Sequence, residues 1–419
     1  MKKYILRIAA ILLMMRYYLP IVPANIKMYS LFGIDMFAWL WIMALIIFGW
    51  KRVFSVPYLY LYFFALVYIG FTNIFWFDLM NYELSKAFRL DVYGLFISIS
   101  IYDYFISAKD FKGLSIVIVS ALVFIGLSLM IDISVYFATG LSSRAIWSVY
   151  ITLGKKPGGA LSRLGNLGLT YYYGISFIIP ILVAAIKVPQ RKFRESLAII
   201  VLLSILLLSL AIAEYVTALL IGVLGFILSF LGLKRLKTSL IVLTILIIVL
   251  YFAPKASMGH AVDYLSSIVR GDTVESRLDD LSLTTEQGLW ASDTHTGRRA
   301  ARIPFLIQSF LKSPFLGGGP TTEHSYFLDR LSMFGIMGLL PWLLLIRFQF
   351  MRNYRAFNDS FKFHYLLCLL AYITMGITKG IPGIYNSLSM FLLIPGTYYL
   401  VYRPKPELIQ HNIETRQGV

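Results

Sequence analysis

The fold of this chain is constrained most by long apolar runs that show no alternation of polar and apolar residues, such as Leu197–Ala213 and Leu240–Ala253. Of the 419 residues, 58% are hydrophobic and 14% are charged. A water-soluble core cannot bury that much apolar surface. Inside a bilayer the backbone has to satisfy its own hydrogen bonds, which leaves helices or a closed barrel. A barrel would require alternation, so the runs predict membrane-spanning helices.

The fold class expected from these runs is all-α, a polytopic membrane bundle of about 12 helices with roughly 20 apolar residues in each. A tight turn near Glu214 separates two of the spans. The expected spans lie near residues 5–23, 31–50, 57–77, 89–107, 114–138, 171–187, 196–213, 215–232, 238–253, 331–348, 363–379 and 384–402.

Basic residues predict the orientation of the bundle. The net charge is +17, but the charge lies in short loops between spans, which argues against a nucleic-acid partner and for membrane topology. If the spans alternate, these clusters share one side, which is expected to be the cytoplasm, with both termini there. The clusters are Lys2/Lys3, Lys51/Arg52, Lys109/Lys112, Lys187 with Arg191, Lys192 and Arg194, Lys234/Arg235/Lys237, Arg347/Arg352/Arg355 and Arg403/Lys405.

Two long loops remain on the opposite face, at about 139–170 and 254–330. Long loops in a compact bundle are usually functional or disordered. In the second loop a periodic apolar set between Ile303 and Leu311 and a turn at Pro314–Pro320 predict one or two short helices that lie on the bundle. The chain contains no internal repeat or linker, so residues 1–419 are expected to form one integral-membrane domain.

Arginines are the first candidate binding groups of these loops. Arg298 and Arg302 are four residues apart and would share a helical face, with Arg299 beside them. Guanidinium groups bind phosphate through two parallel hydrogen bonds. Arg163 lies in the first loop, just before a span. For Arg298, Arg299 and Arg302 the alternative is a solvated basic helix that contacts lipid headgroups. For Arg163 it is a long loop to which the positive-inside rule does not apply.

His324 is the candidate catalytic residue. It follows the turn Gly317–Pro320 and precedes the span that starts near Leu331, and it lies between Glu323 and Asp329. An imidazole can act as a general base near neutral pH. The alternatives are a structural histidine and, for the glycines, a plain helix terminator.

Ionisable residues also occur inside the expected spans, where they are functional candidates by default: Arg16, Asp35, Asp103, Asp132 and Glu214. The charged groups of most of these side chains could reach the ends of the spans. The sequence leaves open whether Arg16 pairs with Asp35. No metal-ligand spacing and no nucleotide-binding motif is present, so we expect no metal and no cofactor.

The segment 296–340 resembles the C-terminal signature of the O-antigen polymerase (Wzy) and O-antigen ligase superfamily. The matching parts are TGRRAARI, KSPFLGGG, HSYFLDRL and FGIMGLL. The ligase branch often has an arginine where this chain has Glu214, and a glutamate where it has Met333. HSYFLDRL looks more like the polymerase branch.

The resemblance implies a bacterial inner-membrane glycosyltransferase whose active site faces the periplasm. It would transfer a growing glycan from undecaprenyl diphosphate to another lipid-linked repeat unit, without a metal. The diphosphate would be bound by Arg163, Arg298, Arg299 and Arg302. His324 would act as the base for the acceptor hydroxyl. Expected partners are the lipid-linked oligosaccharide, membrane lipid and, as a candidate, a chain-length regulator. The alternatives are an O-antigen ligase acting on lipid A-core and a lipid-linked oligosaccharide flippase.

Overall fold

The computed structural model describes residues 2–19, 35–49, 55–70, 92–146, 167–188, 192–231, 302–319, 325–379 and 383–402. Within these ranges the chain is helical and contains no strand, which confirms the all-α prediction there. The expected span 238–253 and most of both long loops lie outside the described residues.

Within the described residues, five helices are long and apolar enough to cross a membrane: Phe111–Thr139, Leu169–Ile186, Phe193–Ile212, Tyr326–Ala356 and Asp359–Ile377. Large apolar side chains also face outward from the described helices; Phe137 is 74% exposed and Phe193 79% exposed. Lipid is the solvent that suits such surfaces. These helices indicate a membrane protein, and the count of about twelve spans stays a prediction.

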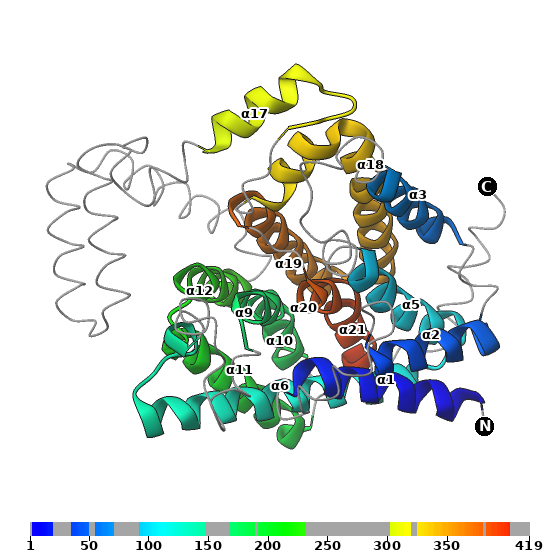
Figure 1. Ribbon diagram of the computed structural model, residues 1–419. Helices are drawn as coiled ribbons and strands as arrows, with labels where there is room; N and C mark the ends of the chain where they lie inside the picture. Colours follow the sequence, from blue (N-terminus) through cyan, green and yellow to red (C-terminus); the bar gives the residue numbers. More distant parts are fainter. Residues whose placement is uncertain are drawn as a thin grey trace, which may run out of the picture. The chain divides into compact units, whose positions relative to one another are not determined.

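The chain divides into two compact units. Unit 1 contains Met1–Ser229, Pro341–Ile373 and Ile381–Val419, and unit 2 contains Phe230–Leu340 and Thr374–Gly380. The prediction of one domain for residues 1–419 stays a prediction. The α-helices, labelled in Figure 1, are α1 (Lys2–Tyr18), α2 (Met36–Gly49), α3 (Val56–Gly70), α5 (Gly94–Ser107), α6 (Phe111–Thr139), α9 (Leu169–Ser176), α10 (Ile179–Ile186), α11 (Phe193–Ile212), α12 (Val216–Leu231), α17 (Arg302–Lys312), α18 (Tyr326–Ala356), α19 (Asp359–Thr378), α20 (Ile384–Leu388) and α21 (Ile394–Tyr402). A short π-helix, η6 (Ser389–Leu393), joins α20 to α21.

The C-terminal segment α20–η6–α21 lies at the centre of unit 1, where it packs against α5, α6, α9 and α10 (Figure 1). Its residues from Ile384 to Thr397 are almost all buried. Small residues let the backbones approach closely, as at Gly174, where a Cβ atom would lie 3.0 Å from the Tyr385 carbonyl oxygen. The last expected span is therefore a core helix, enclosed by protein instead of lipid.

An ion pair ties α1 to the start of α6. Arg7 donates to both carboxylate oxygens of Asp110, at 2.9 and 2.5 Å, and Asp110 also accepts a hydrogen bond from the Gly113 amide as the N-cap of α6. Burial by itself would raise the pKa of the Asp110 carboxyl, but the hydrogen bonds from Arg7 and Gly113 outweigh it, so the pKa is lowered. The cap therefore stays charged and keeps α1 against α6.

The expected turn near Glu214 is present. Helix α11 ends at Ile212 and α12 begins at Val216. Between them Glu214 has a φ of 60°, in the left-handed region that non-glycine residues seldom adopt. The two helices are thus separate elements joined by a strained, very short connection.

Candidate functional site

The predicted site residues fall mostly outside the described part of the chain. Arg163, Arg298, Arg299 and His324 all lie outside it, so the expected diphosphate cluster and base stay predictions. Arg302 is described and is the first residue of α17. Its Nη1 atom is buried and has no hydrogen-bond partner among the described residues. A buried guanidinium nitrogen without a partner is a group that a phosphate oxygen could satisfy.

Helix α17 is the short helix predicted from the apolar periodicity. Ile303, Leu306, Ile307, Phe310 and Leu311 share one face, and Leu306 is buried. Lys312 ends the helix, and the chain then turns through residues 313–316 into the glycine-rich segment. The helix therefore joins Arg302 to that segment within unit 2.

The glycine-rich segment is bonded to a break in α18. In an unbroken helix the amides of Ile336 and Met337 would donate to the carbonyls four residues earlier, Ser332 and Met333. Here they donate to Pro314 and Phe315 instead, at 2.9 and 3.2 Å. The freed carbonyls accept from the segment in return: Gly318 donates to Met333 at 3.0 Å and Gly319 donates to Ser332 at 2.9 Å.

This exchange satisfies the backbone groups that the break exposes. Non-helical backbone within membrane-spanning segments occurs only where protein or water provides such partners. The segment 314–319 is thus a structural part of α18 as much as a turn after α17. The alternative of a plain helix terminator accounts for none of these four hydrogen bonds.

Two glycines make the close approach possible. Gly335 lies at the break with φ 58° and ψ −160°, a region essentially restricted to glycine. Gly317 has φ 76°, and a Cβ atom there would overlap the Met333 carbonyl and lie 2.5 Å from the Gly335 nitrogen. A Cβ atom on Gly335 would meet the Phe315 carbonyl and lie 2.7 Å from the Gly317 nitrogen. The two backbones touch, and neither position has room for a side chain.

The start of α18 is fixed by the end of α19. Ser325 donates through its hydroxyl to the Ile377 carbonyl at 2.5 Å, and the Tyr326 amide donates to the Lys379 carbonyl at 3.0 Å. The Ser325 amide donates to Asp329 at 3.3 Å. Gly319 and Ser325, which border residues 320–324 on either side, are therefore both held by hydrogen bonds. His324 is the residue directly before Ser325.

Unit 1 contains a second polar cluster, centred on Asp132 of α6. Its carboxylate accepts hydrogen bonds from the hydroxyls of Ser143, Tyr172 and Ser209, the last at 3.2 Å. These donors come from segment 142–146, α9 and α11, and Asp132 is only 3% exposed. The sequence allowed Asp132 to reach a span end, but the structure buries it as a junction between four segments.

The turn at Glu214 borders this cluster. Arg144 donates to the Glu214 carbonyl at 3.2 Å, and the ring of Tyr215 packs on that of Tyr172 with centroids 5.0 Å apart. Strained backbone, a buried carboxylate and a guanidinium therefore occur together, a combination that is frequent at functional sites.

Replacing Asp132 by alanine is expected to destabilise unit 1, because three buried hydroxyls lose their acceptor. At 1–3 kcal/mol for each unsatisfied group, a loss of several kcal/mol is expected. The thermal unfolding midpoint of the purified protein in detergent measures it. Asp359→Ala is the matched control, since Asp359 is 91% exposed and forms a surface ion pair with Lys362, three residues away. If the two variants had equal unfolding midpoints, the hydrogen bonds to Asp132 would not stabilise the junction between the four segments.

Arg16 is paired in the structure, which answers the question that the sequence left open. Its Nε atom lies 2.5 Å from Asp35. Asp103 is likewise paired with Arg352 at 2.5 Å. Both pairs neutralise charge inside the bundle, as buried ions require.

Sequence reasoning missed Arg144, Ser143, Tyr172 and Ser209 as members of a polar cluster. One signal was available for Arg144, which is a cation in the same long loop as Arg163. No local signal marks the three hydroxyl residues, because they lie 11, 40 and 77 residues from Asp132 in the chain. Among the described residues, no group of three His, Cys, Asp or Glu side chains could hold a metal ion.

No model of a known protein family matches this chain, and no curated protein matches it.

Proposed function

We propose that this protein is an O-antigen polymerase of the bacterial inner membrane. It transfers the growing glycan from undecaprenyl diphosphate to a lipid-linked repeat unit at the periplasmic face. The proposal includes about twelve spans, cytoplasmic termini and two long periplasmic loops. The observation that carries it is the docking of Gly317–Gly319 into the break of α18, with Ser325 fixed on α19.

That docking supports the proposal because it gives a physical reason for the spacing of the motif. The parts KSPFLGGG and FGIMGLL are bonded to each other, and HSYFLDRL begins at the residue next to Ser325. A catalytic group has to be held by rigid neighbours if it is to meet its substrate in one geometry. Gly319 and Ser325, the described residues on either side of 320–324, are both fixed by hydrogen bonds, which supports His324 as the catalytic group.

In the proposed reaction the acceptor hydroxyl attacks the anomeric carbon of the donor glycan. A new C–O glycosidic bond forms as the bond from that carbon to the diphosphate oxygen breaks, and undecaprenyl diphosphate leaves. His324 takes the hydroxyl proton. Arg163, Arg298, Arg299 and Arg302 stabilise the charge that develops on the diphosphate. No metal is needed for these steps, and the apolar helices hold the polyprenyl tails.

The pairing of cations inside unit 1 favours an enzyme over a flippase. A flippase for an anionic lipid would be expected to present cations within its spans to the substrate. Here Arg16 is engaged by Asp35. The departures at Glu214 and Met333 favour a polymerase over a ligase.

The lipopolysaccharide gel pattern of a strain that lacks this protein tests the function. A single band of core plus one repeat unit is expected, because units are still made, exported and ligated but not joined. Restoring the gene should restore the ladder. Bare core with polymer stranded on the lipid carrier would identify a ligase, and single units stranded inside the cell would identify a flippase. Either result would contradict the polymerase proposal.

A further inference from the structure

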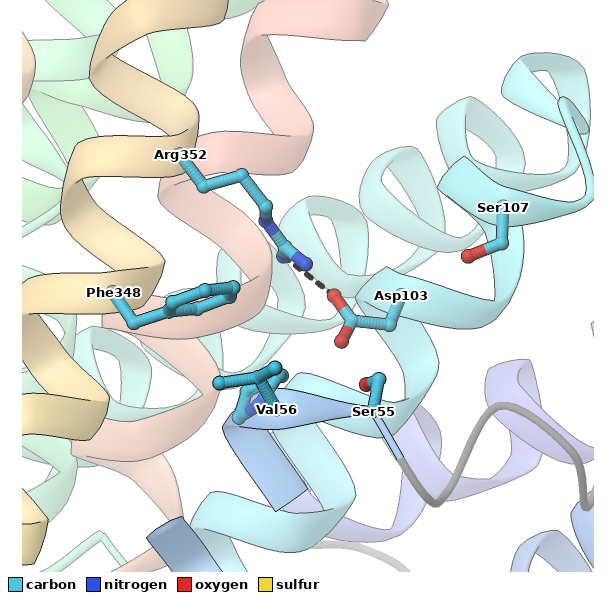
Figure 2. A pocket seen from close by; sticks show the side chains of 7 residues that line it. Ser55, Val56, Asp103, Ser107, Phe348 and Arg352 are labelled. Atoms are coloured by element: carbon cyan, nitrogen blue, oxygen red, sulfur yellow. Dashed lines mark hydrogen bonds and ion pairs between the residues drawn. The ribbon is translucent and has the colours of Figure 1, made fainter. Parts of the chain in front are cut away.

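A cavity of about 290 Å³ lies at the end of the bundle where α3 begins (Figure 2). Its walls come from three helices that are far apart in sequence. Its lining residues are Ser55, Val56, Pro57, Asp103, Ser107, Phe348 and Arg352. Ligand pockets typically measure about 300–1,000 Å³, so this one suits a small polar group. All of its lining residues belong to unit 1.

The charges of the cavity point to a ligand that carries both signs. Asp103 and Arg352 form an ion pair at 2.5 Å, and the other lining residues are neutral. Figure 2 shows Arg352 and Phe348 on one side, Ser55 and Ser107 on the other, and the Asp103 carboxylate between them. A simple anion would be repelled by Asp103, and a simple cation by Arg352. A group with a phosphate and an ammonium could satisfy both.

The start of α3 strengthens the phosphate half of the site. Ser55 immediately precedes the helix, and its carbonyl accepts from the Tyr58 amide at 2.9 Å. Pro57 has no amide hydrogen, and the Tyr58 and Leu59 amides both donate to the Ser55 carbonyl, so the Val56 amide is the first-turn donor left without a partner within the helix. With the guanidinium of Arg352, which is 29% exposed, the Val56 amide forms a receptor for a phosphate.

An apolar stripe leads away from the cavity along α3. Val56, Leu59, Phe63 and Leu66 are spaced three or four residues apart, so they share one face, and all four are exposed. Leu59 is 55% exposed and Leu66 is 67% exposed. A ligand with its charged head in the cavity and hydrocarbon along this stripe would be a phospholipid.

Basic residues suggest which leaflet would supply it. Arg347 and Arg355 lie on the same end of α18 as Arg352, and Lys109 lies two residues after Ser107, the last residue of α5. Such residues mark the cytoplasmic boundary. We infer that this cavity binds the headgroup of a zwitterionic phospholipid with a primary ammonium, such as phosphatidylethanolamine, from the cytoplasmic leaflet. The ammonium contacts Asp103 and the serine hydroxyls, and the phosphate contacts Arg352 and the Val56 amide.

Native mass spectrometry of the purified, delipidated full chain tests the inference. The probes are phosphatidylethanolamine and phosphatidylglycerol with identical acyl chains, added separately and in competition. The wild type is expected to bind phosphatidylethanolamine about tenfold more tightly, which corresponds to about 1.4 kcal/mol. Equal binding, preference for phosphatidylglycerol, or no lipid adduct would overturn the inference, whatever the outcome for polymerase activity.

Two variants assign the binding to the cavity. Ser107→Phe and Ser55→Phe, on different helices, fill it without removing the ion pair, and each should abolish the preference for phosphatidylethanolamine. Ser134→Phe is the matched control, because Ser134 is exposed on α6 and bonds only within its own helix. The control should retain wild-type binding. A preference that persists in both cavity variants would place the lipid elsewhere and overturn the assignment.

Discussion

Replacing His324 by alanine is expected to abolish chain extension while the protein remains in the membrane. Removal of a general base typically lowers a rate by a factor of about 10²–10⁴, and such a loss reduces a polymer ladder to core plus a single unit. The measurement is the lipopolysaccharide gel of a deletion strain that carries the variant. An immunoblot of the membrane fraction reports the amount of protein.

His295→Ala is the matched control for this prediction. It makes the same substitution in the same predicted loop but lies outside the motif, so the ladder should be unchanged. A normal ladder from the His324 variant would remove His324 from the mechanism. The polymerase function would then still be decided by the strain that lacks the whole protein.

Replacing Gly335 by alanine is expected to destabilise the break in α18 and to abolish polymer formation. A non-glycine residue at this φ and ψ costs about 1–3 kcal/mol. The added Cβ would also push against the Phe315 carbonyl and the Gly317 nitrogen. Displacing the segment 314–319 would release four backbone hydrogen bonds, each with a net contribution of about 0.5–1.5 kcal/mol. The thermal unfolding midpoint and the gel ladder measure the two effects.

Gly140→Ala separates backbone strain from steric overlap. Gly140 also has a left-handed φ, 69°, but no atom lies within 4 Å of the position where its Cβ would be. Its alanine variant should lose about 1 kcal/mol and keep the ladder. If the two variants lost equal stability, the contact between Gly335 and Gly317 would have no energetic role beyond the dihedral angles.

The helical elements could be predicted because their signals are local. Hydropathy over a window of about 20 residues identified apolar segments, and helices occupy those segments wherever they are described. The period of the apolar residues from Ile303 to Leu311 predicted α17, and the polar residue at Glu214 predicted the turn between α11 and α12. None of these predictions required knowledge of a distant part of the chain.

The partners of the buried ions could not be predicted, because they lie far from those ions in the sequence. Asp103 and Arg352 are 249 residues apart, and their pairing depends on how α5 and α18 pack. The donors to Asp132 come from three other segments, and serine or tyrosine in an apolar segment gives no sign of a shared acceptor. From the sequence, the carboxylates of Asp103 and Asp132 were expected to be costly to bury inside a span. Which groups neutralise or hydrogen-bond them depends on how the helices pack.

The candidate site has one part that local sequence patterns predict and one part that depends on distant contacts. The motif from Arg298 to Leu340 was recognisable from residue types and spacing, and it names His324 and the arginines as the residues to test. Its glycines were ambiguous as sequence, because a helix terminator and a close-packed backbone both require glycine. Only the tertiary structure placed Gly317 against Gly335 and exchanged the hydrogen bonds of α18 for those of the segment 314–319.

By itself, the sequence determined that this protein is helical, apolar and suited to a membrane, since backbone hydrogen bonding in lipid leaves few choices and hydropathy is read locally. The tertiary structure decided which glycines touch, which charges pair, and that the last helices form the core of unit 1. These outcomes depend on contacts between distant segments, where shape and the need to satisfy every buried polar group act together.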